Sequence, residues 1–554
     1  MCNRLCLGIL ATFLFCAGVV QGTEYYVSPS GSNWNSGKSP QKPWKTIGKV
    51  NERTFKAGDR ILFEGGKTFK GGLKFDAKDS GAPGNPVTVG AYGGGRATIS
   101  SGRKHGLYAE NCGGFVIKDL IFVGAGREVK KNFSGIYLFA NRGKDAKPEY
   151  IRIDNVEVSG YRQRGIHISG SPTSNSGFKD VRITNADVHD NGNQGIASSG
   201  SKPPGDWVHK GIYVGDCKVY NNVGISGGRG HSGNGIIFSS VDGAVIEYCE
   251  AYNNGQLSDD PNSGGPIAIW AWDSSNVVIQ YCEAYGNKTG NKADGGGFDL
   301  DGGCVNCVMQ YNYSHGNYGA GYGIYQYKDA REFKNNVVRY NITEADGIRN
   351  KHGGINFWST NSSGGLQNTR VYNNTIFIGD ETNGAGIVDF PDEEGTCYVY
   401  DTEIYNNIIL TTPGKRVLDI PNPQSRWNFR GNCYWTYGGD IEIKWGDAKY
   451  TNLNDWRVAS GQERVSGMDV GFQIDPKLID AGRGGTIGDA RLLPTLNAYK
   501  LTSSSPLIDT GLDIESAFGI DVGKHDYYGT EIPSGGRFDI GAHEFSKSAA
   551  GSGH

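Results

Sequence analysis

A short unit recurs along this chain and limits the folds that are open to it. Each unit starts with Gly, or once Pro, followed by an apolar, any and a second apolar residue, then a polar turn and a second short strand pattern. Such a period, without a helical pattern, indicates a solenoid, because one unit cannot bury its apolar face alone. The units start 24 to 40 residues apart, at Gly135, Gly165, Gly195, Gly235, Pro266, Gly297, Gly321, Gly354 and Gly386.

Composition agrees with one long β architecture. A length of 554 residues suggests several domains, but 86 Gly, 30 Tyr and only 3 Met favour a single β structure with end caps. The formal net charge is -3 and no run of Lys or Arg forms a basic stripe. We therefore predict no nucleic-acid partner and expect a monomer.

The first 22 residues have the features of a secretion signal. Arg4 supplies the positive end, residues 5–20 form the apolar stretch, and Val20, Gln21 and Gly22 form a cleavage site. No second long apolar run follows, so we predict a chain without a membrane span. The expected location is secreted or periplasmic.

The cysteines favour stacking over disulfides. Cys217, Cys249 and Cys282 occupy matching places in successive repeats, reading GDCKVY, EYCEAY and QYCEAY. This recurrence predicts a column of buried thiols, and pairing in an oxidising compartment is the alternative. Cys304 and Cys307 form a lone CxxC, a weak metal motif.

Asparagine recurs at the turn after the second strand of each unit. The side chain tolerates left-handed backbone, and its amide can bond to the next coil. The residues are Asn222, Asn254, Asn287 and Asn317.

The repeat pattern over residues 86–435 resembles the right-handed parallel β-helix of the pectate-lyase-like superfamily. The resemblance implies an all-β solenoid and a secreted polysaccharide-active enzyme, either a glycoside hydrolase or a polysaccharide lyase. Residues 23–85, with YYVSPSGSNW and AGDRILFEGG, are similar to the N-terminal region of such bacterial proteins. A helix near residues 44–51 is expected to cap the open end. Residues 436–546, with SSSPLIDTG and FDIGAHEF, resemble a closing segment, and residues 547–554 are predicted to be a flexible tail.

One acidic strand carries the most chemistry. From Asp294 to Gly303 the chain reads DGGGFDLDGG. In a strand over residues 298–301, alternation places Asp299 and Asp301 on one face, and the flanking glycines allow close approach. An Asp-rich turn is the alternative. Nearby like charges raise one carboxyl pKa, which provides an acid and a base. We therefore predict glycosidic hydrolysis by Asp299 and Asp301, with Asp294 as a third carboxylate.

Aligning the repeats predicts an aromatic surface around these carboxylates. Flat rings suit the apolar faces of sugars, although loops that cover the rings would make them a satellite core. His231, just before a repeat start, is a further catalytic candidate. The expected substrate-binding residues are Trp270, Trp272, Tyr325, Tyr327, Trp358, Asn356, Lys328 and His352.

Two other functions remain open. A Ca²⁺-dependent lyase would use the three aspartates as metal ligands and a lysine as base, with Lys292, Lys328 and Lys351 as candidates. A carbohydrate-binding β-helix would bind a glycan without cleaving it. A hydrolase needs no cofactor. The acidic run over residues 389–394 is expected to be a solvated loop. In each case the predicted partner is a polysaccharide or oligosaccharide, and the sequence does not identify the sugar.

Overall fold

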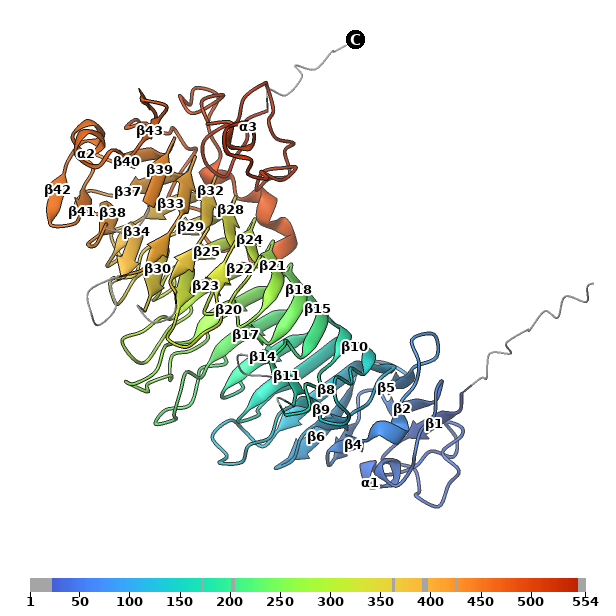
Figure 1. Ribbon diagram of the computed structural model, residues 1–554. Helices are drawn as coiled ribbons and strands as arrows, with labels where there is room; N and C mark the ends of the chain where they lie inside the picture. Colours follow the sequence, from blue (N-terminus) through green and yellow to red (C-terminus); the bar gives the residue numbers. More distant parts are fainter. Residues whose placement is uncertain are drawn as a thin grey trace, which may run out of the picture.

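The computed structural model describes residues 22–171, 173–200, 205–360, 364–390, 397–423 and 427–546. The chain coils into an elongated stack of parallel strands (Figure 1). The predicted all-β solenoid is therefore confirmed. The predicted signal up to residue 21, the tail at 547–554 and residues 391–394 of the acidic run lie outside the described residues. Within the described part, no helix is long and apolar enough to cross a membrane.

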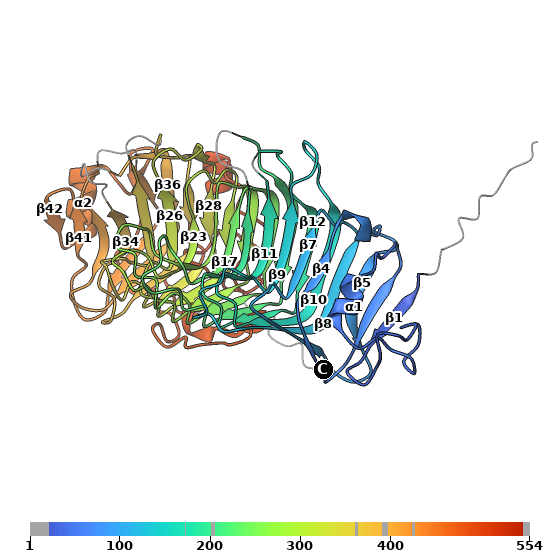
Figure 2. The same cartoon turned by 90° about the horizontal axis from the view of Figure 1, so that it is seen from below.

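Each central coil contributes one strand to each of three parallel ladders. The first ladder forms its own sheet, labelled in part in Figure 2, in which the last strand, β42, pairs antiparallel with β41. Its strands are β4 (Leu73–Phe75), β7 (Leu107–Glu110), β9 (Ile136–Ala140), β11 (Arg164–Gly170), β14 (Gln194–Ser199), β17 (Asn234–Ser239), β20 (Ile267–Trp272), β23 (Gly296–Leu300), β26 (Tyr322–Gln326), β30 (Ile355–Ser359), β34 (Ala385–Phe390), β38 (Arg416–Ile420), β41 (Ile443–Trp445) and β42 (Ala448–Tyr450). We call this sheet the site sheet.

The other two ladders join through β8 and β10 into one larger sheet. One ladder contains β1 (Glu24–Val27), β2 (Arg60–Glu64), β5 (Val87–Tyr92), β8 (Phe115–Gly124), β10 (Glu149–Ser159), β12 (Lys179–Thr184), β15 (His209–Gly215), β18 (Val241–Glu247), β21 (Ser275–Gln280), β24 (Val308–Gln310), β28 (Val337–Arg339), β32 (Arg370–Tyr372), β36 (Thr402–Tyr405) and β39 (Trp427–Arg430). The second contains β3 (Thr68–Lys70), β6 (Ala97–Gly102), β13 (Asp187–His189), β16 (Lys218–Tyr220), β19 (Glu250–Tyr252), β22 (Glu283–Tyr285), β25 (Tyr313–His315), β29 (Ile342–Glu344), β33 (Thr375–Ile378), β37 (Ile408–Thr411) and β40 (Cys433–Thr436).

Apolar residues of the repeats point inward and form the core. Ile166 pairs with Ile136 and Ile196 on the neighbouring coils, and all three are fully buried. One coil departs from the predicted alignment, because Ile236 pairs with Ile269 and not with Ile267. The shift is two residues, so the side chains of β20 keep their faces.

Asparagine ladders tie the coils together. The backbone N–H of Asn222 donates to Asn254 Oδ1 at 3.0 Å, and that of Asn254 donates to Asn287 Oδ1 at 3.2 Å. The predicted bond to the next coil is thus confirmed. The prediction that the ladder asparagines themselves have left-handed backbone was wrong by one residue. The left-handed residues are Asn221 and Asn253, which come just before Asn222 and Asn254 in the chain and have φ of 53° and 54°. The ladder residue itself is held by its amide bonds.

The repeated cysteines are buried and form no disulfide, which confirms the predicted column of buried thiols. Cys304 and Cys307 are buried as well. Among the described residues, no group of three or more His, Cys, Asp or Glu side chains is placed to hold a metal ion.

Stacking extends beyond residues 86–435. At the N-terminal end β1 already pairs in parallel with β2, and Trp44, 1% exposed, packs there beside α1 (Ile47–Asn51). The other end carries α2 (Leu453–Ser460) and the short hairpin of β43 (Arg464–Val465) and β44 (Met468–Asp469). A small three-stranded ladder of β27 (Phe333–Lys334), β31 (Leu366–Gln367) and β35 (Val399–Tyr400) flanks the stack.

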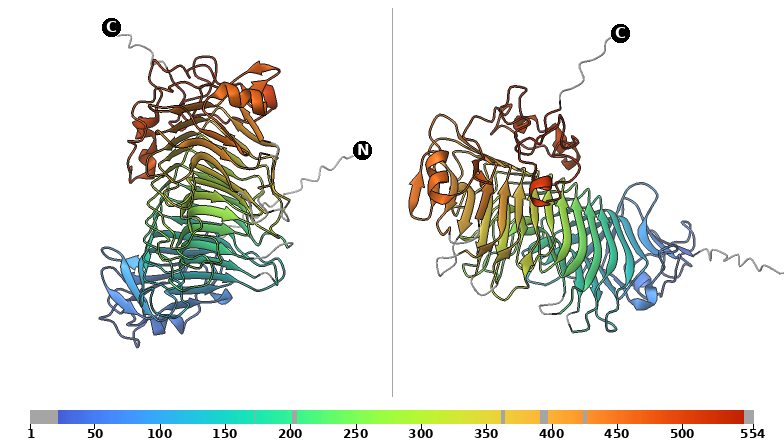
Figure 3. Two further views of the ribbon diagram at one scale, coloured as in Figure 1. Left: turned by 90° about the vertical axis from the view of Figure 1, so that its left-hand side faces the viewer. Right: turned by 45° about the horizontal axis from the view of Figure 1, so that its top comes forward.

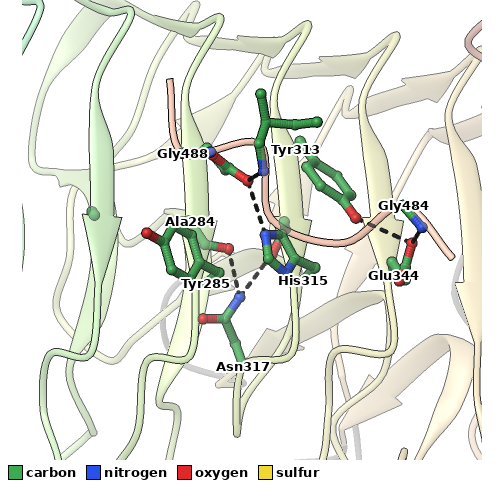
Figure 4. Close-up of polar contacts among 12 residues, drawn as sticks. Ala284, Tyr285, Tyr313, His315, Asn317, Glu344, Gly484 and Gly488 are labelled. Atoms are coloured by element: carbon green, nitrogen blue, oxygen red, sulfur yellow. Dashed lines mark hydrogen bonds and ion pairs between the residues drawn. The ribbon is translucent and has the colours of Figure 1, made fainter. Parts of the chain in front are cut away.

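The C-terminal segment, which includes α3 (Ile514–Phe518), folds back along the larger sheet (Figure 3). Carboxylates of the larger sheet anchor it. Glu283 accepts the N–H groups of Ile487 and Gly488, each at 2.8 Å, and Glu344 accepts that of Gly484 at 2.8 Å. Figure 4 shows this crossing. The segment therefore covers the larger sheet and leaves the outward face of the site sheet to loops.

Candidate active site

A cavity of about 830 Å³ lies on the outward face of the site sheet. It is lined by side chains of β20, β26, β30 and β34, by residues just after β23 and β26, and by the loops that precede β17, β20, β23 and β30. Parallel strands one coil apart are about 4.8 Å apart, so the cavity spans several coils. Its lining residues are His231, Ser263, Gly264, Trp270, Trp272, Lys292, Ala293, Asp294, Asp301, Tyr325, Tyr327, Lys328, Asp329, Asn350, His352, Trp358 and Phe390.

The acidic strand forms as alternation predicts. Phe298 and Leu300 are fully buried in the core. Asp299 pairs with Trp270 on one neighbouring coil and with Gly323 on the other. Asp301 follows the last residue of β23 and lines the cavity, where its Oδ1 accepts the N–H of Gly302 at 2.6 Å.

Asp294 reaches the same cavity from the turn before β23. Its backbone is left-handed, with φ of 48°, and its Oδ2 accepts the N–H of Gly265 at 2.7 Å. Gly265 permits this approach, because a Cβ there would lie 2.0 Å from the carbonyl oxygen of Ala293. Asp294 and Asp301 therefore both line the cavity.

Burial changes the acidity of all three carboxyl groups. It raises the pKa of Asp294 to about 7, and the charge of Asp301 adds to this rise. It raises the pKa of Asp301 to about 6, partly offset by the N–H of Gly302. Burial, with the charges of Asp301 and Asp294, holds the pKa of Asp299 well above its usual range. Groups with separated pKa values provide an acid and a base in one site.

Asp299 differs from the other two in its exposure to the cavity. It does not line the cavity and is only 2% exposed, and its Oδ1 has no hydrogen-bond partner in the protein. The sequence paired Asp299 with Asp301 as the reacting groups. In the structure, Asp294 and not Asp299 lines the cavity together with Asp301.

The predicted aromatic residues gather at this cavity, but they differ in exposure. Trp270 is 4% exposed and packs in a small cluster with Ala197, Ile237 and Ile267. Its Nε1 donates to Asn234 Oδ1 at 3.0 Å. Trp270 therefore acts largely as a satellite core residue, which was the alternative interpretation of these rings.

The other rings form two edge-to-face pairs along the cavity. The ring centroids of Trp272 and Tyr327 are 6.3 Å apart, and those of Tyr325 and Trp358 are 6.4 Å apart. The register places Tyr325 directly beside Trp358. These four rings supply apolar walls that can contact the faces of sugar rings.

Comparison with known proteins identifies the fold family. The family described as "right handed beta helix region" matches residues 95–376, half of the chain. The chain belongs to this family. The predicted right-handed parallel β-helix is thus confirmed.

A curated relative shares part of this β-helix chain. It is a lacto-N-biosidase of Bifidobacterium longum, 25% identical over an alignment of 450 residues. The match covers 64% of this chain and 27% of the relative. The chain thus spans about a quarter of that protein's length.

Solved structures of similar architecture include a GH136 lacto-N-biosidase from Eubacterium ramulus. It is 17% identical, with a TM-score of 0.49, over 69% of this chain and 67% of that one. A pectate lyase is also 17% identical, with a TM-score of 0.41, over 95% of this chain and 97% of that one.

Two histidines line the β-helix cavity, each held by an asparagine. His231 Nδ1 lies 3.2 Å from Asn234 Nδ2, and His352 Nδ1 lies 2.7 Å from Asn356 Nδ2. Burial lowers the pKa of His231, and it lowers that of His352 to about 4. Both rings are therefore neutral at pH 7. Asn356, predicted to bind substrate, is fully buried and does not line the cavity.

The predicted cationic residues separate into two groups. Lys292 and Lys328 line the cavity with exposed side chains, whereas Lys351 does not line it. Asp389, expected in a solvated loop, is 1% exposed instead. It lies in β34 beside the core residue Phe357, because alternation turns it inward.

Three polar lining residues were not predicted: Ser263, Asp329 and Asn350. They come from loops that carry no repeat, so no sequence periodicity marked them. The cavity also concentrates unpaired polar atoms, since Trp272 Nε1, Tyr325 Oη and Asn350 Nδ2 are buried without a protein partner. Such groups are costly unless water or a ligand satisfies them.

Proposed function

We propose that this protein is a secreted glycoside hydrolase that cleaves a polysaccharide or oligosaccharide with Asp294 and Asp301. The observation that carries the proposal is the pair of carboxyl groups at one cavity, with pKa values raised to about 7 and about 6. The name of the relative, lacto-N-biosidase, supports glycosidic hydrolysis as the chemistry. Export rests on the secretion signal predicted for residues 1–22.

The two carboxyl groups take different roles. Asp294 has the higher pKa and acts as the general acid, which gives its proton to the glycosidic oxygen as the bond breaks. Asp301 is ionised first, and the N–H of Gly302 stabilises its negative charge. It acts as the base that activates water or as the nucleophile. Trp272, Tyr325, Tyr327 and Trp358 hold the sugar rings.

A lyase is the second candidate, because Lys292 and Lys328 line the same cavity. Either lysine would need a lowered pKa to abstract a proton beside a uronate carboxylate. The lyase hypothesis also used the three aspartates as Ca²⁺ ligands, but the described acidic groups form no cluster placed to hold a metal ion. The carboxyl pair therefore favours hydrolysis.

A glycan screen tests the proposal. Purified protein is incubated with neutral and acidic glycans and with p-nitrophenyl glycosides, including the lacto-N-bioside, with and without Ca²⁺. Reducing ends and ultraviolet absorbance are recorded together. We expect new reducing ends without unsaturated products. Unsaturated products would replace the hydrolase by a lyase, and glycan binding without products would make the protein a binding module.

The pH dependence of turnover should follow the carboxyl pair. Asp301 must be ionised, so kcat/KM should rise as pH increases through about 6. Asp294 must be protonated, so kcat/KM should fall as pH increases through about 7. The expected profile is a bell with its maximum between these values, whose limbs belong to the pair as a whole. A plateau that extends beyond pH 9 would contradict Asp294 as the acid.

A further inference from the structure

Three turns of neighbouring coils meet where β20, β23 and β26 end, and we call this region the corner. Backbone bonds join the first two turns, because Asp273 donates its N–H to the carbonyl oxygen of Gly302 at 2.8 Å. One side of the cavity therefore depends on how these turns are held together. With the strand ends that lead into them, they supply the lining residues Trp272, Asp301, Tyr327, Lys328 and Asp329.

Glycines let the turns of the corner pack closely. A Cβ at Gly302 would clash with Cε1 of Tyr327, so the absent side chain lets this ring lie against the backbone beside Asp301. Gly303 has a φ of 79°, and a Cβ there would lie 3.1 Å from Cβ of Arg331. The turn that carries Asp301 is thus packed directly against the turn that carries Tyr327.

Gln326 links the same two turns. It is the last residue of β26 and is fully buried. Its Oε1 accepts the N–H of Gly303 at 3.0 Å, and its Nε2 donates to the carbonyl oxygen of Arg331 at 2.7 Å. One side chain therefore fixes the turn after β23 relative to the turn after β26.

An ion pair fixes the turn after β20. Arg331 Nε donates to Asp273 Oδ1, and the two side chains are 17% and 1% exposed. The guanidinium carbon of Arg331 also lies 5.2 Å from the ring centre of Trp207, in the loop before β15. A pair in this environment is screened by water and salt much less than a surface pair, so it holds the two turns in one arrangement.

This ion pair is poorly suited to stabilise the fold by itself. Asp273 Oδ2 and Arg331 Nη2 have no hydrogen-bond partner in the protein. A buried ion pair offsets the cost of removing its charges from water only when its remaining polar atoms are also bonded. Its place beside the lining residues of the corner therefore favours a role in geometry.

We propose that Asp273, Gln326 and Arg331 are positioning residues, which hold Asp301 and Tyr327 in the arrangement that turnover requires. This inference rests on the proposed function. None of the three lines the cavity, so each acts through the turns and not by contact with the substrate. A displacement of about 1 Å can lower a rate by about 10²-fold, so loosening of the corner should be visible in the kinetics.

A double-mutant cycle on the ion pair tests the proposal. Wild type, Asp273→Asn, Arg331→Met and the double variant are compared on the substrate identified by the screen. Asparagine tolerates the left-handed backbone at position 273, where φ is 44°. We expect each single variant to lower kcat/KM by about 10- to 100-fold, and the double variant to be no worse than the poorer single variant. Losses that multiply in the double variant would show that the pair does not act as a unit and would overturn the proposal.

Gln326→Leu gives a readout that a loss of stability alone does not produce. It removes both bonds of the side chain and loosens the turn whose Gly302 N–H lowers the pKa of Asp301. The pKa of Asp301 should then rise, so the acidic limb of the pH profile should move to higher pH while kcat falls. A wild-type kcat with an unmoved acidic limb would contradict the role of Gln326.

Arg152→Met is the matched control for Arg331→Met. Arg152 pairs with Asp180 at 2.7 Å on the larger sheet, and neither residue lines the cavity. This variant also removes an ion pair from the fold, yet it should leave kcat/KM unchanged. If it lowers kcat/KM as much as Arg331→Met does, the losses at the corner reflect stability alone and the positioning role is wrong.

The two proposals fail differently. If wild type cleaves no glycan, the hydrolase proposal fails, and amide hydrogen exchange without ligand still tests the corner. The N–H of Gly303 should exchange faster in Gln326→Leu and in Arg331→Met than in wild type or Arg152→Met, and equal exchange in all four would show that these side chains do not hold the turns. If wild type cleaves glycans and all the corner variants match it, the hydrolase proposal stands and the positioning role is wrong.

Discussion

Replacing Asp301 by asparagine is expected to lower kcat by about 10²–10⁴-fold, the usual contribution of a positioned acid or base. Asparagine has nearly the same shape, but it carries no negative charge and cannot accept a proton from water or attack the sugar. The fold should persist, since the carboxyl group is replaced by a neutral group of equal size. Initial rates on the substrate identified by the screen give the result.

Asp294→Asn should cause a loss of similar size on natural glycans. It should cost less on a p-nitrophenyl glycoside, because that leaving group departs without protonation. This difference separates the acid from the base. The basic limb of the pH profile should also disappear in this variant. Asp447, exposed in the loop between β41 and β42, provides the matched control Asp447→Asn, which should retain wild-type rates. Full activity in either cavity variant would remove that carboxyl group from the mechanism.

The largest loss of stability is expected from Asn374→Ala. Asn374 belongs to an asparagine ladder between coils and is 1% exposed. Its Oδ1 accepts the backbone N–H and the Nδ2 of Asn341, each at 3.0 Å, and its Nδ2 donates to the carbonyl of Val338 at 2.9 Å. Alanine leaves these buried groups unpaired. At about 1–3 kcal/mol for each orphaned group, the free energy of unfolding should fall by roughly 3–5 kcal/mol.

Thermal and urea unfolding of the variant measure this loss. Asn454→Ala is the matched control, because Asn454 is exposed on α2. It should change the free energy of unfolding by no more than about 0.5 kcal/mol. If Asn374→Ala unfolds like this control, the ladder bonds add no net stability and the coils are held by apolar stacking alone.

The sequence by itself determined the architecture and the chemical character of the site. Residues that recur in every unit can pack only on their equivalents one coil away, so the repeat predicted the solenoid, in which Ile136, Ile166 and Ile196 stack on one another. Strand alternation is local, and it fixed Phe298 and Leu300 inward. The predicted register of β20 was wrong by two residues, but a shift of two leaves every side chain on the face that alternation predicts.

Tertiary structure alone decided which carboxyl groups line the cavity. Alternation places Asp299 outward, but it does not say whether neighbouring rings and loops cover it. Asp294 lies in a turn, where its position depends on the N–H of Gly265 from a preceding loop. The cavity wall likewise includes Ser263, Asp329 and Asn350, from loops of different lengths between coils.

For Asp389, too, the tertiary structure decided the environment of the side chain. Its acidic neighbours suggested a solvated loop, yet β34 pairs with β30 and turns its side chain inward. The periodic part of the chain thus encodes the stack through contacts between equivalent residues. The site is formed by contacts between non-equivalent loops that have no period, and only the folded chain brings those together.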